Sequence, residues 1–113
     1  MKYKEQDIVL VKYPFTDLQN IKLRPALILR VYKDDIIVFP ITTKKTGYHY
    51  NISDEDLIDW KLLTQSYLKI SSIFTLNEDL IVMKIATLSE QTFYKIIKKF
   101  IENILDFKNK KWI

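Results

Sequence analysis

The hydrophobic positions along the chain predict several short strands followed by one helix. Asp7–Tyr13 is short, apolar and β-branched, as is typical of a buried strand. Pro25–Val31 and Ile36–Ile41 are two further apolar runs, separated by the polar residues Lys33–Asp35. This short polar connection predicts an antiparallel hairpin. Residues 14–20, which precede the hairpin, are expected to form a turn and a loop.

The middle of the chain is less regular. Residues 42–52 form a polar loop with some extended character at its end, and Gly47 is its flexible point. Ser53 stands before three acidic residues, a pattern that favours the start of a short helix reaching about Trp60. Two more strands with a polar connection are predicted, namely Ser66–Phe74 and Leu80–Ile85, joined by Asn77–Asp79.

The last predicted element is an amphipathic helix that begins after Ser89, a good N-cap residue. Its apolar residues recur at spacings of three and four and form one stripe. The stripe comprises Phe93, Ile96, Ile97, Phe100, Ile101, Ile104 and Leu105, and the opposite face carries Lys95, Lys98, Lys99 and Glu102. We therefore expect a mainly β protein of the α+β class, with a small, strongly curved antiparallel sheet or barrel and the helix packed against it.

Composition narrows the class of protein. The 113 residues fit a single domain (1–113) that is long enough to bury a core. The absence of cysteine excludes disulfides, thiolate metal sites and cysteine nucleophiles. No apolar run approaches the ~18 residues of a membrane span, and the N-terminus does not resemble a signal peptide. We expect a cytoplasmic protein without a membrane partner.

Charge is unevenly distributed. The net charge is +4 and the pI is about 9.2, which by itself does no more than favour solubility. Residues 1–50 carry nine basic and five acidic side chains, whereas residues 51–76 carry two and four. A basic surface in the first half of the chain is therefore plausible, and such a surface would attract a polyanion.

One pair of residues suggests chemistry. Arg24 stands where a polar loop turns into the strand that begins at Pro25, and Thr42 stands where the strand Ile36–Ile41 ends. In an antiparallel hairpin the start of the first strand lies beside the end of the second strand. A guanidinium at the first position and a hydroxyl at the second can therefore converge on one phosphate. Together they suit one phosphate group, although either residue alone is more often an ordinary surface side chain.

In this order, these segments resemble the MazF/PemK family of toxin endoribonucleases from bacterial type II toxin–antitoxin systems. The resemblance covers nearly the whole chain and rests on six segments, namely Asp7–Val11, Pro14–Asp17, Leu23–Leu29, Pro40–Thr43, Ser66–Lys69 and Leu88–Ser89. It implies an SH3-like β-barrel with a C-terminal helix, a homodimer, and cleavage of single-stranded RNA without a metal or other cofactor. It also implies that Arg24 and Thr42 are catalytic.

Further residues are candidates for RNA binding. They are Phe15, Thr16, Lys22, Thr43, Lys44, Tyr48 and Lys69. The rings of Phe15, Tyr48 and Tyr50 either stack on unpaired bases or pack against the barrel, and the sequence does not favour one over the other. Sheet register decides whether Thr42 or Thr43 faces the substrate, and alignment with the family favours Thr42.

The sequence departs from the family pattern at several positions. Gln6 and Ala86 stand where many relatives have glycine, and both changes are expected to be structural. Lys69 replaces an arginine, which keeps the charge but loses bidentate geometry. His49 is the only histidine, and its place between two tyrosines in a loop argues for a non-catalytic role.

Two functions remain open. In the first, the chain is a sequence-selective endoribonuclease neutralised by an acidic antitoxin, with the loop Phe15–Leu23 as a gate over the site. In the second, it is a non-catalytic toxin or binding module on the same fold. Such a chain either resembles the relatives that poison DNA gyrase, through protein contacts near Phe107, Trp112 and Ile113, or is a degenerate member that only binds its partner. The presence of both Arg24 and Thr42 favours the first.

Overall fold

The computed structural model describes residues 2–13, 22–45, 47–59 and 65–106. In chain order its elements are β1 (Asp7–Tyr13), β2 (Lys22–Tyr32), β3 (Asp35–Thr42), β4 (Tyr50–Ile52), the 3-10 turn η1 (Asp54–Asp56), β5 (Ser66–Leu68), β6 (Phe74–Asn77), the 3-10 turn η2 (Glu78–Leu80), β7 (Ile81–Thr87) and α1 (Glu90–Leu105). The predicted strand at Asp7–Tyr13 and the predicted hairpin of β2 and β3 are confirmed.

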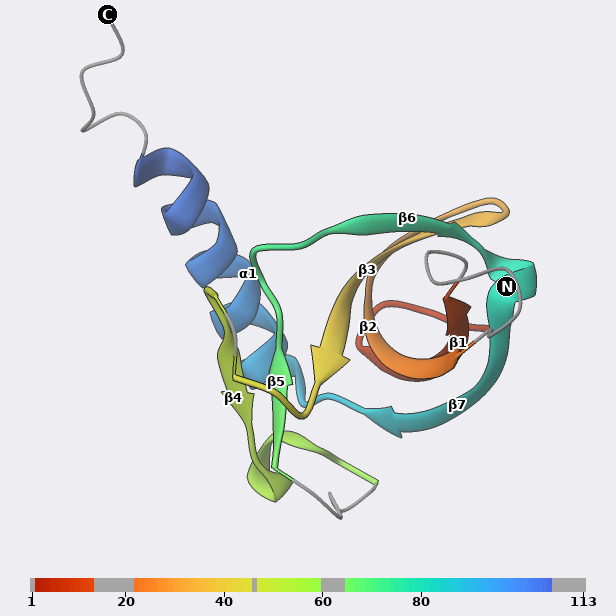
Figure 1. The fold of residues 1–113 in the computed structure, drawn as a ribbon, viewed down its shortest axis with the longest axis horizontal. Helices are drawn as coiled ribbons and strands as arrows, with labels where there is room; N and C mark the ends of the chain where they lie inside the picture. Colours follow the sequence, from red (N-terminus) through yellow and green to blue (C-terminus); the bar gives the residue numbers. More distant parts are fainter. Residues whose placement is uncertain (1, 14–21, 46, 60–64, 107–113) are drawn as a thin grey trace, which may run out of the picture.

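The strands form one strongly curved antiparallel sheet. Their order is β4-β5-β3-β2-β1-β7, and β6 pairs with the first half of β3. Figure 1 looks into the curl, with β1, β2, β3, β6 and β7 arranged around a common centre and α1 to one side. The hydrogen-bonded path does not close, but η2 leads directly from β6 into β7 and joins the two ends of the curl. The α+β class and the curved sheet with a C-terminal helix are therefore confirmed.

Alternate residues of the sheet enter two separate cores. Successive side chains of a strand point to opposite faces, so β3 sends Val38 to one core and Phe39 to the other. The barrel core, enclosed by the curl, contains Val9, Val11, Ala26, Ile28, Ile36, Val38 and Leu76. The helix core, between the sheet and α1, contains Ile8, Leu27, Phe39, Ile41, Ile52, Leu68, Ile70, Ala86, Leu88, Phe93 and Ile96.

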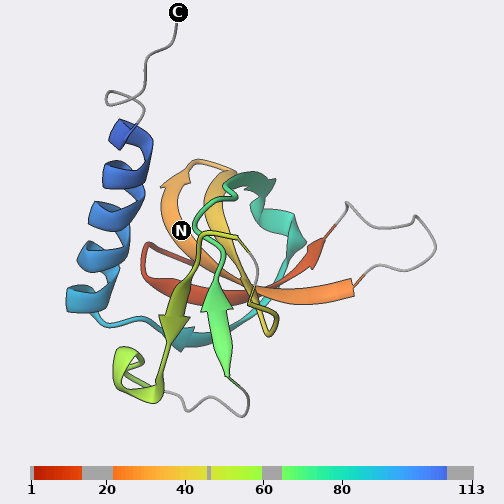
Figure 2. The ribbon, with the colours of Figure 1, turned by 60° about the vertical axis from the view of Figure 1, so that its left-hand side comes forward.

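The helix α1 begins as predicted. The Ser89 hydroxyl accepts a hydrogen bond from the Thr92 amide at 3.2 Å, which caps the first turn. Phe93 and Ile96 are buried in the helix core, but the last turns extend past the sheet, as Figure 2 shows. There the apolar stripe is uncovered, because Ile101, Ile104 and Leu105 are exposed by 48%, 49% and 43%.

The predicted helix from Ser53 to Trp60 is wrong. Only η1 is helical, and Leu57 already has an extended backbone and bridges to Leu88. Asp59 accepts hydrogen bonds from the amide and hydroxyl of Thr87 at 2.7 and 3.1 Å. Pairing with the connection between β7 and α1 therefore draws this segment out of a helix, and Trp60 lies outside the described residues.

The predicted strand Ser66–Phe74 is in fact two strands. β5 ends at Leu68, and β6 begins at Phe74 after a turn in which the Ser72 amide donates to the Lys69 carbonyl at 3.2 Å. The division follows from β3, whose residues 35–38 pair with β6 while residues 41–42 pair with β5. The chain must leave the edge of β3 after one pairing and return to it for the next.

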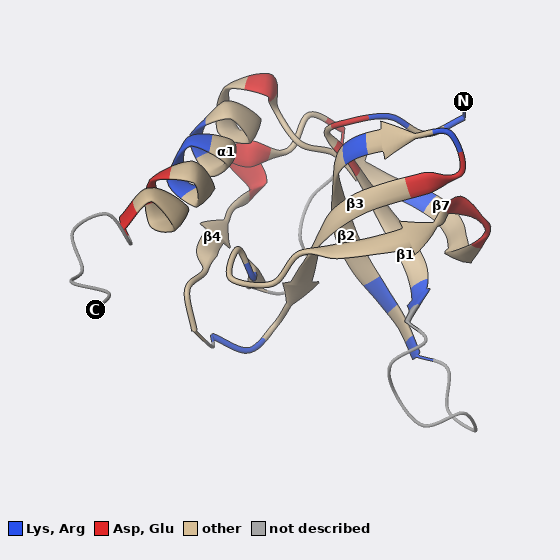
Figure 3. Cartoon of the chain, turned by 90° about the horizontal axis from the view of Figure 1, so that it is seen from above, with Lys and Arg blue, Asp and Glu red and all other residues tan. Residues whose placement is uncertain are grey.

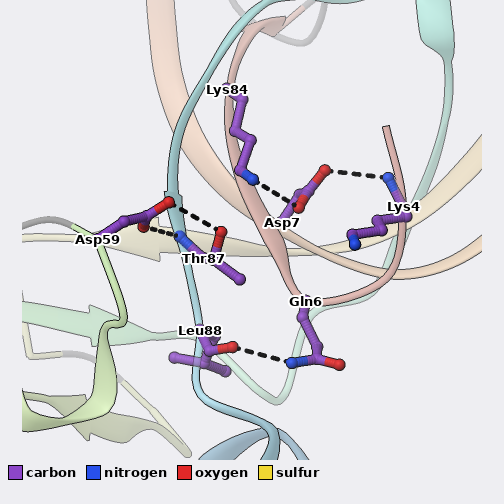
Figure 4. A network of polar contacts seen from close by, with 7 residues as sticks. All are labelled: Lys4, Gln6, Asp7, Asp59, Lys84, Thr87 and Leu88. Carbon is purple, nitrogen blue, oxygen red and sulfur yellow. Dashed lines mark hydrogen bonds and ion pairs between the residues drawn. The ribbon is translucent and has the colours of Figure 1, made fainter. Parts of the chain in front are cut away.

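Gln6 has a backbone conformation that normally favours glycine. Its φ is +77°, in the left-handed region. Its side-chain amide donates to the Leu88 carbonyl at 3.0 Å, and its own carbonyl accepts from the Leu88 amide at 2.9 Å, so it ties the start of β1 to the start of α1 (Figure 4). The hydrogen bonds offset the backbone strain that glycine would avoid.

The same region holds a buried carboxylate. Asp7 is only 2% exposed, and it forms an ion pair with the Lys84 ammonium at 3.4 Å and accepts from the Lys4 amide at 3.0 Å (Figure 4). A buried charge is tolerated when it is paired in this way. Asp7 therefore fastens β1 to the edge strand β7.

The geometry of Gln6 predicts that two substitutions differ in their effect on stability. Gln6→Ala keeps the left-handed strain and removes the side-chain hydrogen bond, so we expect it to lower the free energy of unfolding by about 1 kcal/mol. Gln6→Gly loses the same bond but relieves the strain, so it should be the more stable variant of the two. Urea denaturation followed by circular dichroism measures both, and a Gln6→Gly variant less stable than Gln6→Ala would contradict the interpretation.

Candidate nucleic-acid interface

Arg24 and Thr42 lie at the same end of two neighbouring strands. The last pair recorded between β2 and β3 at this end is Ala26 with Pro40. Arg24 and Thr42 are each two residues beyond that pair, where β2 is paired with β1 and β3 with β5, so a continuation of the β2–β3 register would set them across from one another. Neighbouring strands are about 4.8 Å apart, which allows both side chains to contact one phosphate.

Both residues belong to the barrel-core face of the sheet. Residues two apart on a strand share a face. Arg24 therefore lies on the same face as Ala26 and Ile28, and Thr42 lies on the same face as Val38 and Pro40. Arg24 is also opposite the buried Val11 of β1. The pair therefore stands on the rim where the barrel core gives way to solvent.

The Thr42 hydroxyl has a defined orientation. Its Oγ1 accepts a hydrogen bond from the Lys44 amide at 3.1 Å. A hydroxyl carries one donor and two acceptor sites, so this bond uses an acceptor site and leaves the proton available to donate. The local turn thus presents Thr42 as a hydrogen-bond donor. Thr43, the alternative, lies outside β3 and is exposed.

The three lysines predicted to bind RNA are near this rim and differ in their exposure. Lys22 is exposed and lies two residues before Arg24, on the same face of β2. Lys44 is exposed and lies two residues after the end of β3. Lys69 is half-buried, and its amide donates to the Pro40 carbonyl at 2.9 Å, which places it next to β3. Figure 3 shows basic residues at the end of β1 and at the start of β2.

Not every predicted RNA contact is brought to this rim. Phe15 and Thr16 lie outside the described residues, as does most of the predicted gate Phe15–Leu23. Tyr48 is described, and its ring lies 5.3 Å from the Lys99 ammonium on α1. Its contact with RNA stays a prediction, but its described neighbour is the helix.

Tyr50 packs against the protein. It is half-buried against the helix core, with its ring 5.7 Å from the Lys99 ammonium. Burial raises the pKa of the Tyr50 phenol above its ordinary value, and the nearby Asp56 carboxylate adds to the rise. Of the two alternatives left open by the sequence, packing is the one that applies to Tyr50.

Sequence reasoning missed Asn51, Gln65 and Tyr67. Tyr67 is paired with Thr42 on one side and with Asn51 on the other. Thr42, Tyr67 and Asn51 therefore lie on the same face of the sheet. Gln65 lies just before β5 and donates from its side-chain amide to the Asn51 side chain. The missing signal is the register of β5, because pairing between residues this far apart leaves no local pattern in the sequence.

His49 joins the same group through an aromatic contact. Its ring meets Tyr67 edge to face, with centroids 5.3 Å apart. Its Nδ1 lies 3.0 Å from the Gly47 carbonyl oxygen, which can only accept, so Nδ1 is the donor of this hydrogen bond. The bond fixes the orientation of the ring.

A groove elsewhere on the described surface does not suit a phosphate. A groove of about 580 Å³ lies at the opposite end of the β2–β3 hairpin, and its lining is Lys2, Tyr3, Lys33, Asp34, Glu78, Asp79 and Ile81. Its acidic side chains oppose a phosphate. Within the described ranges, no group of three or more histidine, aspartate or glutamate side chains is placed to hold a metal ion.

Comparison with known proteins identifies the family. Residues 4–104 match the model of the PemK-like, MazF-like toxins of type II toxin–antitoxin systems. The chain belongs to this family. A search of curated proteins returned no match.

Solved structures share the fold of this MazF-like toxin. The toxin MazF-mt6 of Mycobacterium tuberculosis matches with a TM-score of 0.67 at 20% identity, over 88% of this chain and 96% of the other. A mycobacterial endoribonuclease in complex with its cognate antitoxin gives 0.69 at 15% identity, over 98% and 99%. MazF of Deinococcus radiodurans gives 0.66 at 14% identity, over 90% and 96%.

Among the described helices of the toxin, none is long and apolar enough to cross a membrane.

Proposed function

We propose that this MazF-like toxin is a metal-independent endoribonuclease that cleaves single-stranded RNA at selected sequences. The observation that carries the proposal is that Arg24 and Thr42 lie at the same end of the neighbouring strands β2 and β3, each two residues beyond their last recorded pair and on the barrel-core face. Membership in the toxin family and the similarity to a mycobacterial endoribonuclease support it. The substrate would be met in the cytoplasm.

RNA supplies the nucleophile for this reaction. The ribose 2′-oxygen attacks the adjacent phosphorus and the bond from phosphorus to the 5′-oxygen breaks. The 2′-hydroxyl gives its proton to water, and the departing 5′-oxygen takes one up. The products are a 2′,3′-cyclic phosphate and a 5′-hydroxyl. An enzyme for this step must hold the backbone in line and stabilise the charge that develops on the phosphate oxygens.

The two rim residues suit these tasks. The Arg24 guanidinium offers several donors in a fixed plane, and within the described residues no carboxylate neutralises it. The Thr42 hydroxyl, whose oxygen is occupied by the Lys44 amide, donates its proton to a second phosphate oxygen. Lys22, Lys44 and Lys69 add attraction for the flanking backbone.

The same proposal includes two protein partners. A cognate antitoxin is bound in the similar mycobacterial complex, and an acidic segment of such a partner would be attracted to the basic rim. A second copy of the chain would cover the apolar side chains Ile101, Ile104 and Leu105, which α1 leaves exposed.

Replacement of Arg24 tests the site directly. The purified toxin should cleave single-stranded RNA in the presence of EDTA, and Arg24→Ala should lower the cleavage rate by about 100-fold or more, because a charged donor to the transition state is lost. Arg24→Lys should retain part of the activity, since it keeps the charge without the planar donors. Single-turnover cleavage of a labelled RNA measures these rates.

Arg30→Ala is the matched control, because Arg30 is an exposed arginine near the far end of the same strand, stacked on Tyr32 at 5.4 Å. It should cleave at the wild-type rate. Intact RNA with the wild-type protein across diverse sequences would contradict the nuclease function and favour the non-catalytic alternative. Full activity of Arg24→Ala would contradict only the site.

The orientation of Thr42 predicts a separation between two substitutions. Thr42→Val removes the donated proton, so cleavage should slow by about 10- to 100-fold, the value of a hydrogen bond to a charged group. Thr42→Ser keeps the hydroxyl and should remain close to wild type. The same kinetic assay measures both, and equal rates for the valine and serine variants would exclude a hydrogen-bonding role.

The exposed end of α1 predicts that association depends on its apolar side chains. Ile104→Glu should convert the dimer to a monomer in sedimentation velocity, because it places a charge in an apolar contact. Lys98→Glu changes charge on the polar side of the same helix and should leave the dimer intact. A wild-type monomer, or a dimeric Ile104→Glu variant, would contradict this interface.

A further inference from the structure

The face that carries Thr42 continues across two more strands. Thr42 pairs with Tyr67 on β5, and Tyr67 pairs with Asn51 on β4. Figure 2 shows β4 and β5 side by side. At a strand spacing of about 4.8 Å, Asn51 lies about 10 Å from Thr42. This is the scale of the separation between a nucleotide's phosphate and the hydrogen-bonding edge of its base.

The Ile52 backbone carbonyl determines which end of the Gln65 side-chain amide is the nitrogen and which is the oxygen. The Gln65 Nε2 donates to the Ile52 carbonyl at 3.3 Å, and a side-chain oxygen at that position would have nothing to donate. The same nitrogen donates to the Asn51 Oδ1. The two amides therefore have one consistent orientation rather than four interchangeable ones.

The fixed orientation leaves a donor beside an acceptor. Both protons of the Gln65 side-chain amide are used in these two hydrogen bonds, so Gln65 has its Oε1 left as an acceptor. Asn51 uses its Oδ1 as the acceptor from Gln65, so Asn51 has its Nδ2 left as a donor. Within the described part of the chain no other contact occupies these two atoms. Both side chains are exposed. An adjacent donor and acceptor is the pattern with which asparagine and glutamine recognise nucleobase edges.

The aromatic neighbours complete a place for an unpaired base. Tyr67 is half-buried between Thr42 and Asn51, and His49 holds its ring edge to face against it. The bond from His49 Nδ1 to the Gly47 carbonyl keeps that ring in position. Single-stranded RNA is recognised by stacking on such rings combined with hydrogen bonds to the base edge.

We propose that Asn51 and Gln65 form a base-recognition pair that selects the nucleobase adjacent to the scissile phosphate, with Tyr67 as the surface on which that base rests. The inference depends on the proposed ribonuclease function and adds to it the residues that set sequence preference. Arg24 and Thr42 hold the backbone, whereas the amide pair contacts the base.

Replacement of Asn51 by aspartate gives the sharpest test. The carboxylate still accepts from Gln65 Nε2, but its second oxygen replaces the Nδ2 donor with an acceptor. Two adjacent acceptors match the N1–H and N2–H₂ donors of guanine. Asn51→Asp should therefore shift cleavage toward guanine at one position next to the cut by roughly tenfold relative to wild type. Sequencing of the 5′-hydroxyl ends from a randomised RNA library measures the shift.

Two more variants make the result specific. Asn51→Ala and Gln65→Ala should each reduce the base preference at that same position, while both variants still cleave RNA. Gln91→Ala removes an exposed amide on α1, away from the row, and should leave the cleavage profile unchanged. Thermal unfolding by circular dichroism checks that each variant is folded.

The outcomes separate this inference from the function on which it rests. If the wild-type toxin cleaves no RNA, the proposed function is overturned and the base-recognition pair with it. If the wild type cleaves and the Asn51 and Gln65 variants keep its sequence profile, only the base-recognition pair is overturned. A changed preference at one flanking position, with Gln91→Ala unaffected, supports it.

Discussion

The constraint on which the structure depends is that β3 is buried on both faces. Val38 enters the barrel core and Phe39 enters the helix core, so a shift of one residue would exchange the contents of the two cores. The same alternation places Ile41 under the helix and Thr42 on the rim. The burial of apolar side chains on both sides of the sheet therefore determines that Thr42 lies on the rim. The position of its hydroxyl is set by the packing of the two cores.

Local signals account for what the sequence predicted correctly. The bounds of β1, the turn between β2 and β3, and the cap at Ser89 each depend on residues close together in the chain. The two wrong elements depend on distant partners. Leu57 is extended because it bridges to Leu88, and β5 ends at Leu68 because β3 divides its edge between two strands. Propensity and periodicity contain no information about such pairings.

The site was predictable to the same extent. The order of strands and the family resemblance indicated Arg24 and Thr42, and the hairpin of β2 and β3 puts them at the same end of two neighbouring strands. Asn51 and Gln65 carry no motif, and they become neighbours only through the pairing of β4 with β5. Tyr48 illustrates the reverse case, since an aromatic residue near a basic segment suggested RNA binding, while its described partner is Lys99 of the helix.

The turn at Gly47, where φ is +60°, separates two parts of the site with different freedom to vary. Thr42 precedes it on a strand held by two cores, where an inserted residue would invert every following side chain. Asn51 follows it on the short strand β4, which pairs with β5 alone. Insertions and deletions around Gly47 therefore leave the register of β3 unchanged, while they can shift which residue of β4 stands opposite Tyr67. Under the proposed function, divergence in the length of this loop would change the base preference without any change at Arg24 or Thr42.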